Sequence, residues 1–214
     1  MNITLPPLYA ILSADIFPGE AEEWARRLAE AGVELIQYRN KKASSRELLR
    51  VAQALSALAR SHNFRFVVND RADIALLAGA GGVHVGQEDM PVEAARRVCG
   101  PGCWVGVSTH NLEQLRAAAG TTADYIAVGP VFSTESKANP DPVVGVELVR
   151  QARALTTKPL VAIGGITAER AAEVYAAGAD SVAVISDLAR AADLAERVRE
   201  YLRAAEARTL GRRL

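Results

Sequence analysis

Two short segments decide the fold: Phe66-Val67-Val68-Asn69-Asp70 and, after a helical pattern, Gly82-Val83-His84-Val85-Gly86-Gln87-Glu88-Asp89. Each is an apolar run of β type that leads to an aspartate. Strands that follow one another in a regular strand–helix alternation usually lie side by side, with their carboxyl ends at one edge of a parallel sheet. The pattern therefore predicts that Asp70 and Asp89 meet at one mouth of the fold.

Two carboxylates at such a mouth suit a Mg²⁺ ion, which keeps several waters and also holds a substrate phosphate. The sequence thus predicts an enzyme for a phosphorylated or diphosphorylated small molecule, with Asp70 and Asp89 as metal ligands. Asp89 could instead cap a helix that starts near Pro91, and spacing alone leaves both interpretations open. His84 lies inside its strand, where a hydrogen-bonded core residue is favoured over a ligand.

Apolar runs rich in Val, Ile and aromatic residues recur along the chain, with amphipathic segments between them. The eight runs are Leu8–Leu12, Leu35–Tyr38, Phe64–Val68, Gly82–Val85, Trp104–Val107, Tyr125–Val128, Leu160–Ile163 and Ser181–Ile185. Most are continuously apolar, which is typical of strands buried on both faces in a parallel sheet covered by helices.

This pattern predicts an α/β fold, a single-domain TIM (β/α)8 barrel, which a chain of 214 residues can form. The barrel is expected over residues 1–208, with a closing helix over Ala191–Arg208 and a frayed tail at 209–214. The alternative is an open doubly wound sheet. It is disfavoured because no Gly-x-Gly-x-x-Gly opens the first helix.

The composition excludes several classes of function. Lys+Arg and Asp+Glu both number 25 and aromatic residues make up 5%, so no basic or base-stacking surface for nucleic acid is expected. No signal peptide and no apolar stretch of membrane-spanning length are visible, and Cys99 and Cys103 are expected to be reduced thiols. We therefore expect a cytoplasmic protein. An apolar helix face could serve the core or a homo-oligomer.

Polar side chains stand at the ends of several predicted strands. Gln37, Arg39 and Lys41 alternate along one strand end, so they share a face and could cradle an anion; solvated charges are the alternative. Ser108 could reach a ligand from the end of the fifth strand. Gly164-Gly165 and Ile185-Ser186 follow strands seven and eight, where TIM barrels commonly bind phosphate.

The longest irregular segment, residues 129–142, follows the sixth strand. It carries Thr134, Ser136 and Lys137, a short run suited to an anion. Loops of this length are often lids, and one with a lysine could close over a diphosphate. A plain surface loop is the alternative.

Together these motifs resemble the thiamine phosphate synthase family, from Tyr9 to about Ser186. The likeness rests on Gln37–Lys41, Val68–Arg71, Gly82–Pro91, Gly106–Ser108, Gly129–Phe132 with Thr134–Lys137, Val161–Ile166 and Val184–Ser186. It implies a Mg²⁺-dependent transferase that joins a hydroxymethylpyrimidine diphosphate to a thiazole phosphate, releasing pyrophosphate.

The resemblance also assigns roles to residues. It implies that the pyrimidine diphosphate is held by Gln37, Arg39, Lys41, Asn69, Ser108 and Lys137. It implies that the thiazole phosphate is held by Thr134, Ser136, Gly165, Ile185 and Ser186. Asp70 and Asp89 would bind Mg²⁺, while Arg39, Lys41 and Lys137 would stabilise the leaving pyrophosphate.

Two alternatives follow from the same likeness. Thiazole tautomerases share the barrel and the thiazole phosphate site but carry a histidine in the loop after strand six, where this chain has Gly129-Pro130-Val131. A non-catalytic barrel that binds a phosphorylated ligand would have little need for the Asp70/Asp89 pair. The sequence does not distinguish the thiazole phosphate from its carboxylated form.

Overall fold

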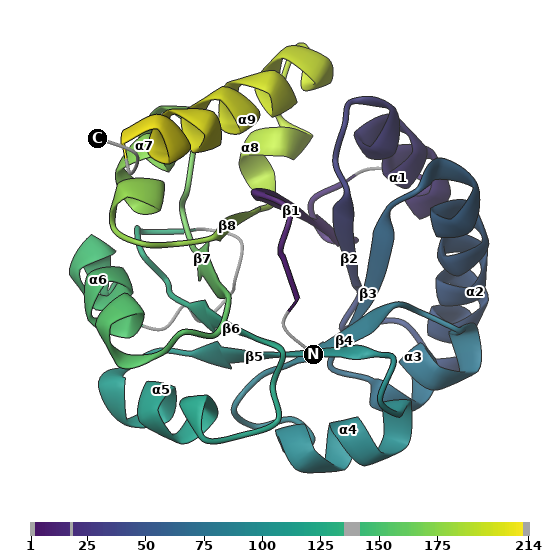
Figure 1. Cartoon of the computed structure of the whole chain (residues 1–214). Coiled ribbons are helices and arrows are strands. Elements are labelled where there is room, and N and C mark those ends of the chain that lie inside the picture. Colours follow the sequence, from purple (N-terminus) through teal and green to yellow (C-terminus); the bar gives the residue numbers. More distant parts are fainter. Residues whose placement is uncertain (1–2, 18, 135–141, 212–214) are drawn as a thin grey trace.

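The computed structural model describes residues 3–17, 19–134 and 142–211, with side chains up to residue 207. Its eight strands pair in parallel, in sequence order, and β1 also pairs with β8, so the sheet closes into a barrel (Figure 1). The strands are β1 Leu8–Ser13, β2 Leu35–Arg39, β3 Arg65–Asn69, β4 Gly82–Val85, β5 Trp104–Thr109, β6 Tyr125–Val128, β7 Leu160–Ile163 and β8 Ser181–Val184. The predicted TIM barrel is therefore confirmed.

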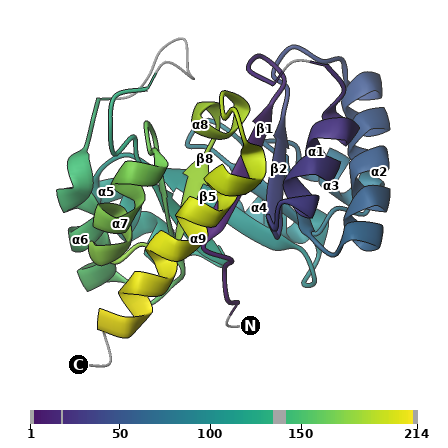
Figure 2. The same ribbon diagram turned by 90° about the horizontal axis from the view of Figure 1, so that it is seen from above.

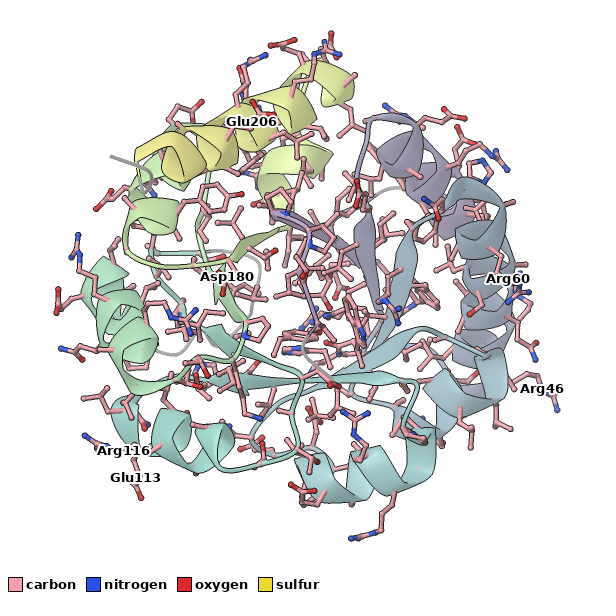
Figure 3. All side chains as sticks on the ribbon, in the orientation of Figure 1. Arg46, Arg60, Glu113, Arg116, Asp180 and Glu206 are labelled. Atoms are coloured by element: carbon pink, nitrogen blue, oxygen red, sulfur yellow. The ribbon has the colours of Figure 1, made fainter. Side chains whose placement is uncertain are left out.

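Helices surround the barrel (Figures 1 and 2). They are α1 Ala21–Glu30, α2 Ser45–His62, α3 Ala72–Ala78, α4 Val92–Cys99, α5 Leu112–Ala119, α6 Gly145–Leu155, α7 Ala168–Ala176, α8 Ser186–Ala189 and α9 Leu194–Gly211. Charged side chains such as Arg46, Arg60, Glu113 and Arg116 project outward from this ring (Figure 3). None of the helices within the described ranges combines the length and the apolarity of a membrane span.

The end of the chain differs from the expectation in two ways. The eighth strand stops at Val184 because the backbone leaves the extended region at Ile185 (ψ −83°), and the short helix α8 follows. The final helix starts at Leu194 and continues to Gly211, beyond the Arg208 end that the sequence predicted. Residues 212–214 of the expected tail lie outside the described residues.

Two apolar cores hold the fold together. The outer core lies between strands and helices and takes alternate strand residues such as Leu8, Ala10 and Leu12. The barrel interior takes the other set, including Tyr9, Ile11, Leu35, Val67, Tyr125, Ala127, Val161 and Ala183. Leu5 packs into the interior from the segment before β1, next to Trp104. The interior is thus filled from the amino end of the strands, and polar residues gather at the carboxyl end.

Candidate active site

The carboxyl ends of the strands form the mouth of the barrel, and the strand register decides which side chains meet there. Arg39 on β2 pairs in register with Ser13 on β1, and Asn69 on β3 pairs with His84 on β4. Because side chains alternate between the two faces of a strand, Gln37 and Arg39 both face the interior. On β5 the register partner of His84 is Gly106, and Ser108 lies two residues farther toward the carboxyl end.

Asp70 follows β3 in an unusual backbone conformation. Its φ is +64°, in the left-handed region that few non-glycine residues occupy, and its backbone N–H donates to the carbonyl of His84 at 2.7 Å. This bond extends the β3–β4 ladder by one residue. Lys41, beyond the end of β2, lies 3.2 Å from Asp70 Oδ2. The two predicted site residues therefore form an ion pair.

Asp89 is held by the turn that follows β4. Its Oδ2 accepts a hydrogen bond from the backbone N–H of Gly86 at 2.7 Å, and a Cβ at Gly86 would lie 2.9 Å from that same oxygen. The helix α4 has Pro91 as its N-cap residue and no side-chain cap. The interpretation of Asp89 as a helix cap is therefore wrong. Its carboxyl group lies instead close enough to Asp70 to raise the pKa of that residue.

The pKa of Asp70 is raised above the ordinary value of an aspartate. Burial is the largest cause and the Asp89 carboxyl adds to it, while Lys41 acts in the opposite direction. Two carboxylates that repel each other are a ready site for a divalent cation. No group of three or more His, Cys, Asp or Glu gathers in the described parts of the chain. A pair suits Mg²⁺, which binds through one or two carboxylates and takes its other ligands from water and phosphate.

The basic and amide residues of β2 divide into two levels. Gln37 is 2% exposed, and its Nε2 donates to the hydroxyl of Tyr9 at 2.6 Å, so it lies in the floor of the mouth. Arg39 is half-buried and donates to Ser13 Oγ at 3.2 Å. The predicted shared face therefore holds for Gln37 and Arg39, while Lys41 extends from the loop to Asp70.

The fifth strand places Ser108 beside the imidazole of His84. His84 Nε2 lies 2.9 Å from Ser108 Oγ, and His84 Nδ1 lies 3.1 Å from the hydroxyl of Tyr125. Gln87 donates to the carbonyl of Ser108 at 2.6 Å. His84 is thus the hydrogen-bonded core residue that was expected. Sequence reasoning missed Tyr9, Tyr125 and Gln87 here, although Tyr9 and Tyr125 stand at interior-facing strand positions.

Two glycines after β7 let a neighbouring loop approach. Gly164 has φ +102° and Gly165 has φ +59°, and a Cβ at Gly165 would overlap the carbonyl oxygen of Ser133. The segment after β6 lies against this turn, because Val131 N–H donates to Ile163 O at 2.8 Å and Phe132 N–H to Gly164 O at 2.9 Å. The two glycines are therefore needed for the close packing of the loop after β6 against this turn.

The predicted phosphate residues Ile185 and Ser186 stand at the junction of β8 and α8. The hydroxyl of Tyr201, on α9, donates to Asp187 Oδ2 at 2.7 Å and also lies 3.2 Å from Ile166 O. It thereby ties α8 to the turn after β7. A short helix at this point is a recurrent part of phosphate sites in TIM barrels. Thr134 ends the described part of the preceding loop, and the predicted Ser136 and Lys137 lie outside the described residues.

Comparisons with known proteins point in one direction. A family model described as thiamine monophosphate synthase matches residues 8–188. A thiamine-phosphate synthase from Koribacter versatilis is 52% identical over 94% of this chain and 96% of its own length. A thiamine-phosphate synthase from Shouchella clausii is 41% identical over 87% of this chain and 90% of its own length. The solved thiamine phosphate pyrophosphorylase from Pyrococcus furiosus superposes with a TM-score of 0.84 at 36% identity, covering 94% of this chain and 96% of that one.

Proposed function

The chain belongs to the thiamine monophosphate synthase family, and from that premise we propose that it joins a hydroxymethylpyrimidine diphosphate to a hydroxyethylthiazole phosphate or its carboxylated form. The products are thiamine phosphate and pyrophosphate. The observation that carries the proposal is the cluster of Lys41, Asp70 and Asp89 at the mouth of the barrel. Such a cluster suits a diphosphate that arrives with a divalent cation.

The pyrimidine diphosphate would occupy the side of the mouth formed by β2–β5. Arg39 and Lys41 supply cationic donors for its phosphate oxygens, and Asn69, Gln37 and Ser108 supply neutral polar groups. Asp70 and Asp89 would hold Mg²⁺, and the raised pKa of Asp70 beside Asp89 supports this because a cation relieves the repulsion. When bound, Mg²⁺ supplies positive charge against the oxygens of the leaving pyrophosphate.

The proposed reaction begins with cleavage of the bond between the pyrimidine methylene carbon and the diphosphate oxygen. Both electrons leave with pyrophosphate, and Arg39, Lys41 and Lys137 stabilise the charge that develops there. The thiazole nitrogen then gives its lone pair to the methylene carbocation and forms the new C–N bond. That nitrogen carries no proton, so no residue has to act as its general base. Positioning and charge stabilisation are the main tasks of the protein.

The thiazole phosphate would occupy the opposite side of the mouth, after β7 and β8. Gly165, Ile185 and Ser186 offer backbone and hydroxyl donors there, and Thr134 and Ser136 would approach from the loop after β6. The contact of Tyr201 with both Ile166 O and Asp187 supports this assignment, because it fixes the two segments that would surround the phosphate.

An end-point assay tests the proposal. Purified protein is mixed with both substrates and Mg²⁺, thiamine phosphate is quantified, and EDTA serves as the metal control. We expect Mg²⁺-dependent product, and a loss of about 100-fold or more in Asp70→Asn. The matched control is Asp73→Asn, which removes a nearby carboxylate that pairs with Arg71. Product that survives both EDTA and Asp70→Asn would contradict the metal site.

Two further arms distinguish the alternatives. No coupling, while both substrates still raise the Tm, would indicate a binding barrel, and isomerisation of the thiazole alone would indicate a tautomerase.

Lys137→Ala should lower turnover by about two orders of magnitude. The control is Lys42→Ala, because Lys42 is an exposed lysine that pairs with Asp15 at 2.5 Å. Turnover near normal in Lys137→Ala would reject Lys137 as a charge stabiliser.

A further inference from the structure

A chain of hydrogen bonds crosses the interior of the barrel from β2 to β5. Gln37 Nε2 lies 2.6 Å from Tyr9 Oη, Tyr9 Oη lies 3.0 Å from Tyr125 Oη, Tyr125 Oη lies 3.1 Å from His84 Nδ1, and His84 Nε2 lies 2.9 Å from Ser108 Oγ. We name these five residues the interior chain. Both of its ends, Gln37 and Ser108, are residues proposed to hold the pyrimidine diphosphate. Its three middle members have no role in the mechanism above.

The fold makes room for the middle of the interior chain. Gly106 on β5 faces the ring of Tyr125, and a Cβ there would overlap that ring. Tyr125 stacks on His84 with 5.5 Å between ring centroids and meets Tyr9 edge-on at 6.0 Å. Both tyrosines are at most 1% exposed. Polar groups buried this deeply are costly unless every one of them is satisfied, so the interior chain is a built feature.

All members of the interior chain are neutral near pH 7. Burial raises the pKa of Tyr9 and of Tyr125 well above the ordinary value, so both hydroxyls keep their protons. The imidazole of His84 is buried between two hydroxyl groups, Tyr125 Oη and Ser108 Oγ, and burial favours its neutral form, which carries one N–H. Each of the three middle residues therefore has one proton to donate along the chain.

This count fixes the direction of the interior chain. The amide Nε2 of Gln37 donates to Tyr9 Oη, so the Tyr9 proton goes to Tyr125 Oη, its other partner among the described residues. The Tyr125 proton then goes to His84 Nδ1, which leaves the imidazole proton on Nε2, where it is donated to Ser108 Oγ. The hydroxyl proton of Ser108 is thereby left for a partner outside these five residues, because Ser108 is half-exposed at the mouth of the barrel.

We propose that Tyr9, Tyr125 and His84 are positioning residues that set Ser108 as a hydrogen-bond donor toward the bound substrate. A donor at this point selects a substrate that presents an acceptor there, such as a ring nitrogen or a phosphate oxygen. This inference rests on the proposed function only for the statement that Ser108 contacts substrate. The direction of the interior chain is a property of the protein alone and can be measured without any substrate.

The first experiment measures the tautomer of His84. The chain has three histidines, so the ¹⁵N spectrum of protein labelled in histidine is simple, and His84→Gln identifies the signals of His84. We expect the neutral Nε2–H tautomer near pH 7, with Nδ1 as an unprotonated acceptor. The Nδ1–H tautomer would overturn the direction assigned to the interior chain, whether or not the protein couples the two substrates.

The second experiment is a double-mutant cycle on Tyr125 and Ser108. Tyr125→Phe removes one hydroxyl and should lower kcat by about three- to tenfold, without changing KM for the thiazole phosphate. If Tyr125 acts through Ser108, the double variant Tyr125→Phe/Ser108→Ala is no slower than Ser108→Ala alone. Losses that multiply would overturn the positioning role.

A matched control separates positioning from general stability. Tyr175 is another fully buried tyrosine, and its hydroxyl donates to Pro7 O at 2.9 Å, before β1 and away from the mouth. Tyr175→Phe should leave kcat unchanged, and an equal loss of kcat in this variant would overturn the inference. If Ser108→Ala keeps full activity, the assigned contact between Ser108 and substrate fails, while the tautomer still reports on the interior chain.

Discussion

At the scale of single residues, Asp70 combines two constraints that a structural residue rarely carries. Its backbone occupies the left-handed region, and its carboxyl group lies beside that of Asp89, a repulsion that Lys41 offsets among the described residues. Each constraint destabilises the folded state. Strained backbone and perturbed carboxyl groups concentrate at functional sites, where a ligand supplies what the free protein lacks. This combination supports the proposal that Asp70 is a ligand of a divalent cation.

His84 gives a prediction about pH. Burial lowers its pKa from 6.5 to about 4, against a smaller opposing effect of Asp89. Because the pKa in the folded state lies below that of the unfolded chain, neutral His84 contributes stability that is complete above pH 6.5 and is lost as the pH falls toward 4. The full difference corresponds to about 3 kcal/mol.

Urea unfolding at about pH 7 and about pH 4.5 measures this contribution. The native chain should lose more unfolding free energy between the two conditions than His84→Gln, which has no imidazole to protonate, because other groups titrate equally in both. His62→Gln, at the last turn of α2, is the control and should behave like the native chain. Parallel losses in the native chain and His84→Gln would contradict the prediction.

At the scale of elements, the turn after β7 depends on Gly165. The residue needs φ +59°, and its missing Cβ leaves space for the carbonyl of Ser133. Gly79 is a matched control, since it ends α3 at φ +64° with open space around it. Gly79→Ala should cost about 1 kcal/mol from the backbone alone. Gly165→Ala should cost more, and because it displaces the loop after β6 it should also raise KM for the thiazole phosphate.

Thermal unfolding and steady-state kinetics on the two glycine variants give the answer. Equal stability losses would show that the turn relaxes without strain, and an unchanged KM for the thiazole phosphate in Gly165→Ala would place the phosphate elsewhere. Gly79→Ala is expected to keep the native KM, because α3 contributes no residue to the proposed phosphate side.

The elements also show what the sequence could predict. Strands such as Tyr125–Val128 are apolar on both faces, so a continuous apolar run in the sequence identifies them. Their alternation with helical segments predicted the barrel. The meeting of Asp70 with Asp89 followed from strand order. The helix α8 was missed because four residues are too few to show a helical period. The interior chain was missed because Tyr9 and Tyr125 lie 116 positions apart and only the closed barrel joins them.

At the scale of the whole molecule, the two ends of the barrel have different tasks. At the mouth, the charged side chains of Lys41, Asp70 and Asp89 lie near one another, whereas at the amino end charged side chains bind the backbone of the strands. Asp124 and Asp180 each stand directly before a strand, β6 and β8 respectively. Each accepts a hydrogen bond from a backbone N–H at the start of the neighbouring strand, Val105 on β5 and Leu160 on β7. Each also pairs with an arginine of a surrounding helix. Repetition of one arrangement on β5–β6 and β7–β8 indicates that this end stabilises the fold.

This division predicts opposite outcomes for two aspartate substitutions. Asp180 Oδ2 accepts from Leu160 N–H and lies 2.9 Å from Arg153, at the position marked in Figure 3. Asp180→Ala leaves both donors without that acceptor, so we expect a loss of about 2–3 kcal/mol and a Tm lower by about 5–10 °C. Well below the Tm its kcat/KM should be native, because none of these groups reaches the mouth.

Asp70→Asn should show the reverse. Asparagine tolerates the left-handed backbone and removes the repulsion with Asp89, so the metal-free protein should keep or gain Tm while Mg²⁺-dependent turnover is lost. The two variants are compared by their Tm, measured without Mg²⁺, and by their kcat/KM, measured with Mg²⁺. A native Tm in Asp180→Ala, or a large loss of Tm in Asp70→Asn, would mean that stability and ligand binding are not divided between the two ends of this barrel.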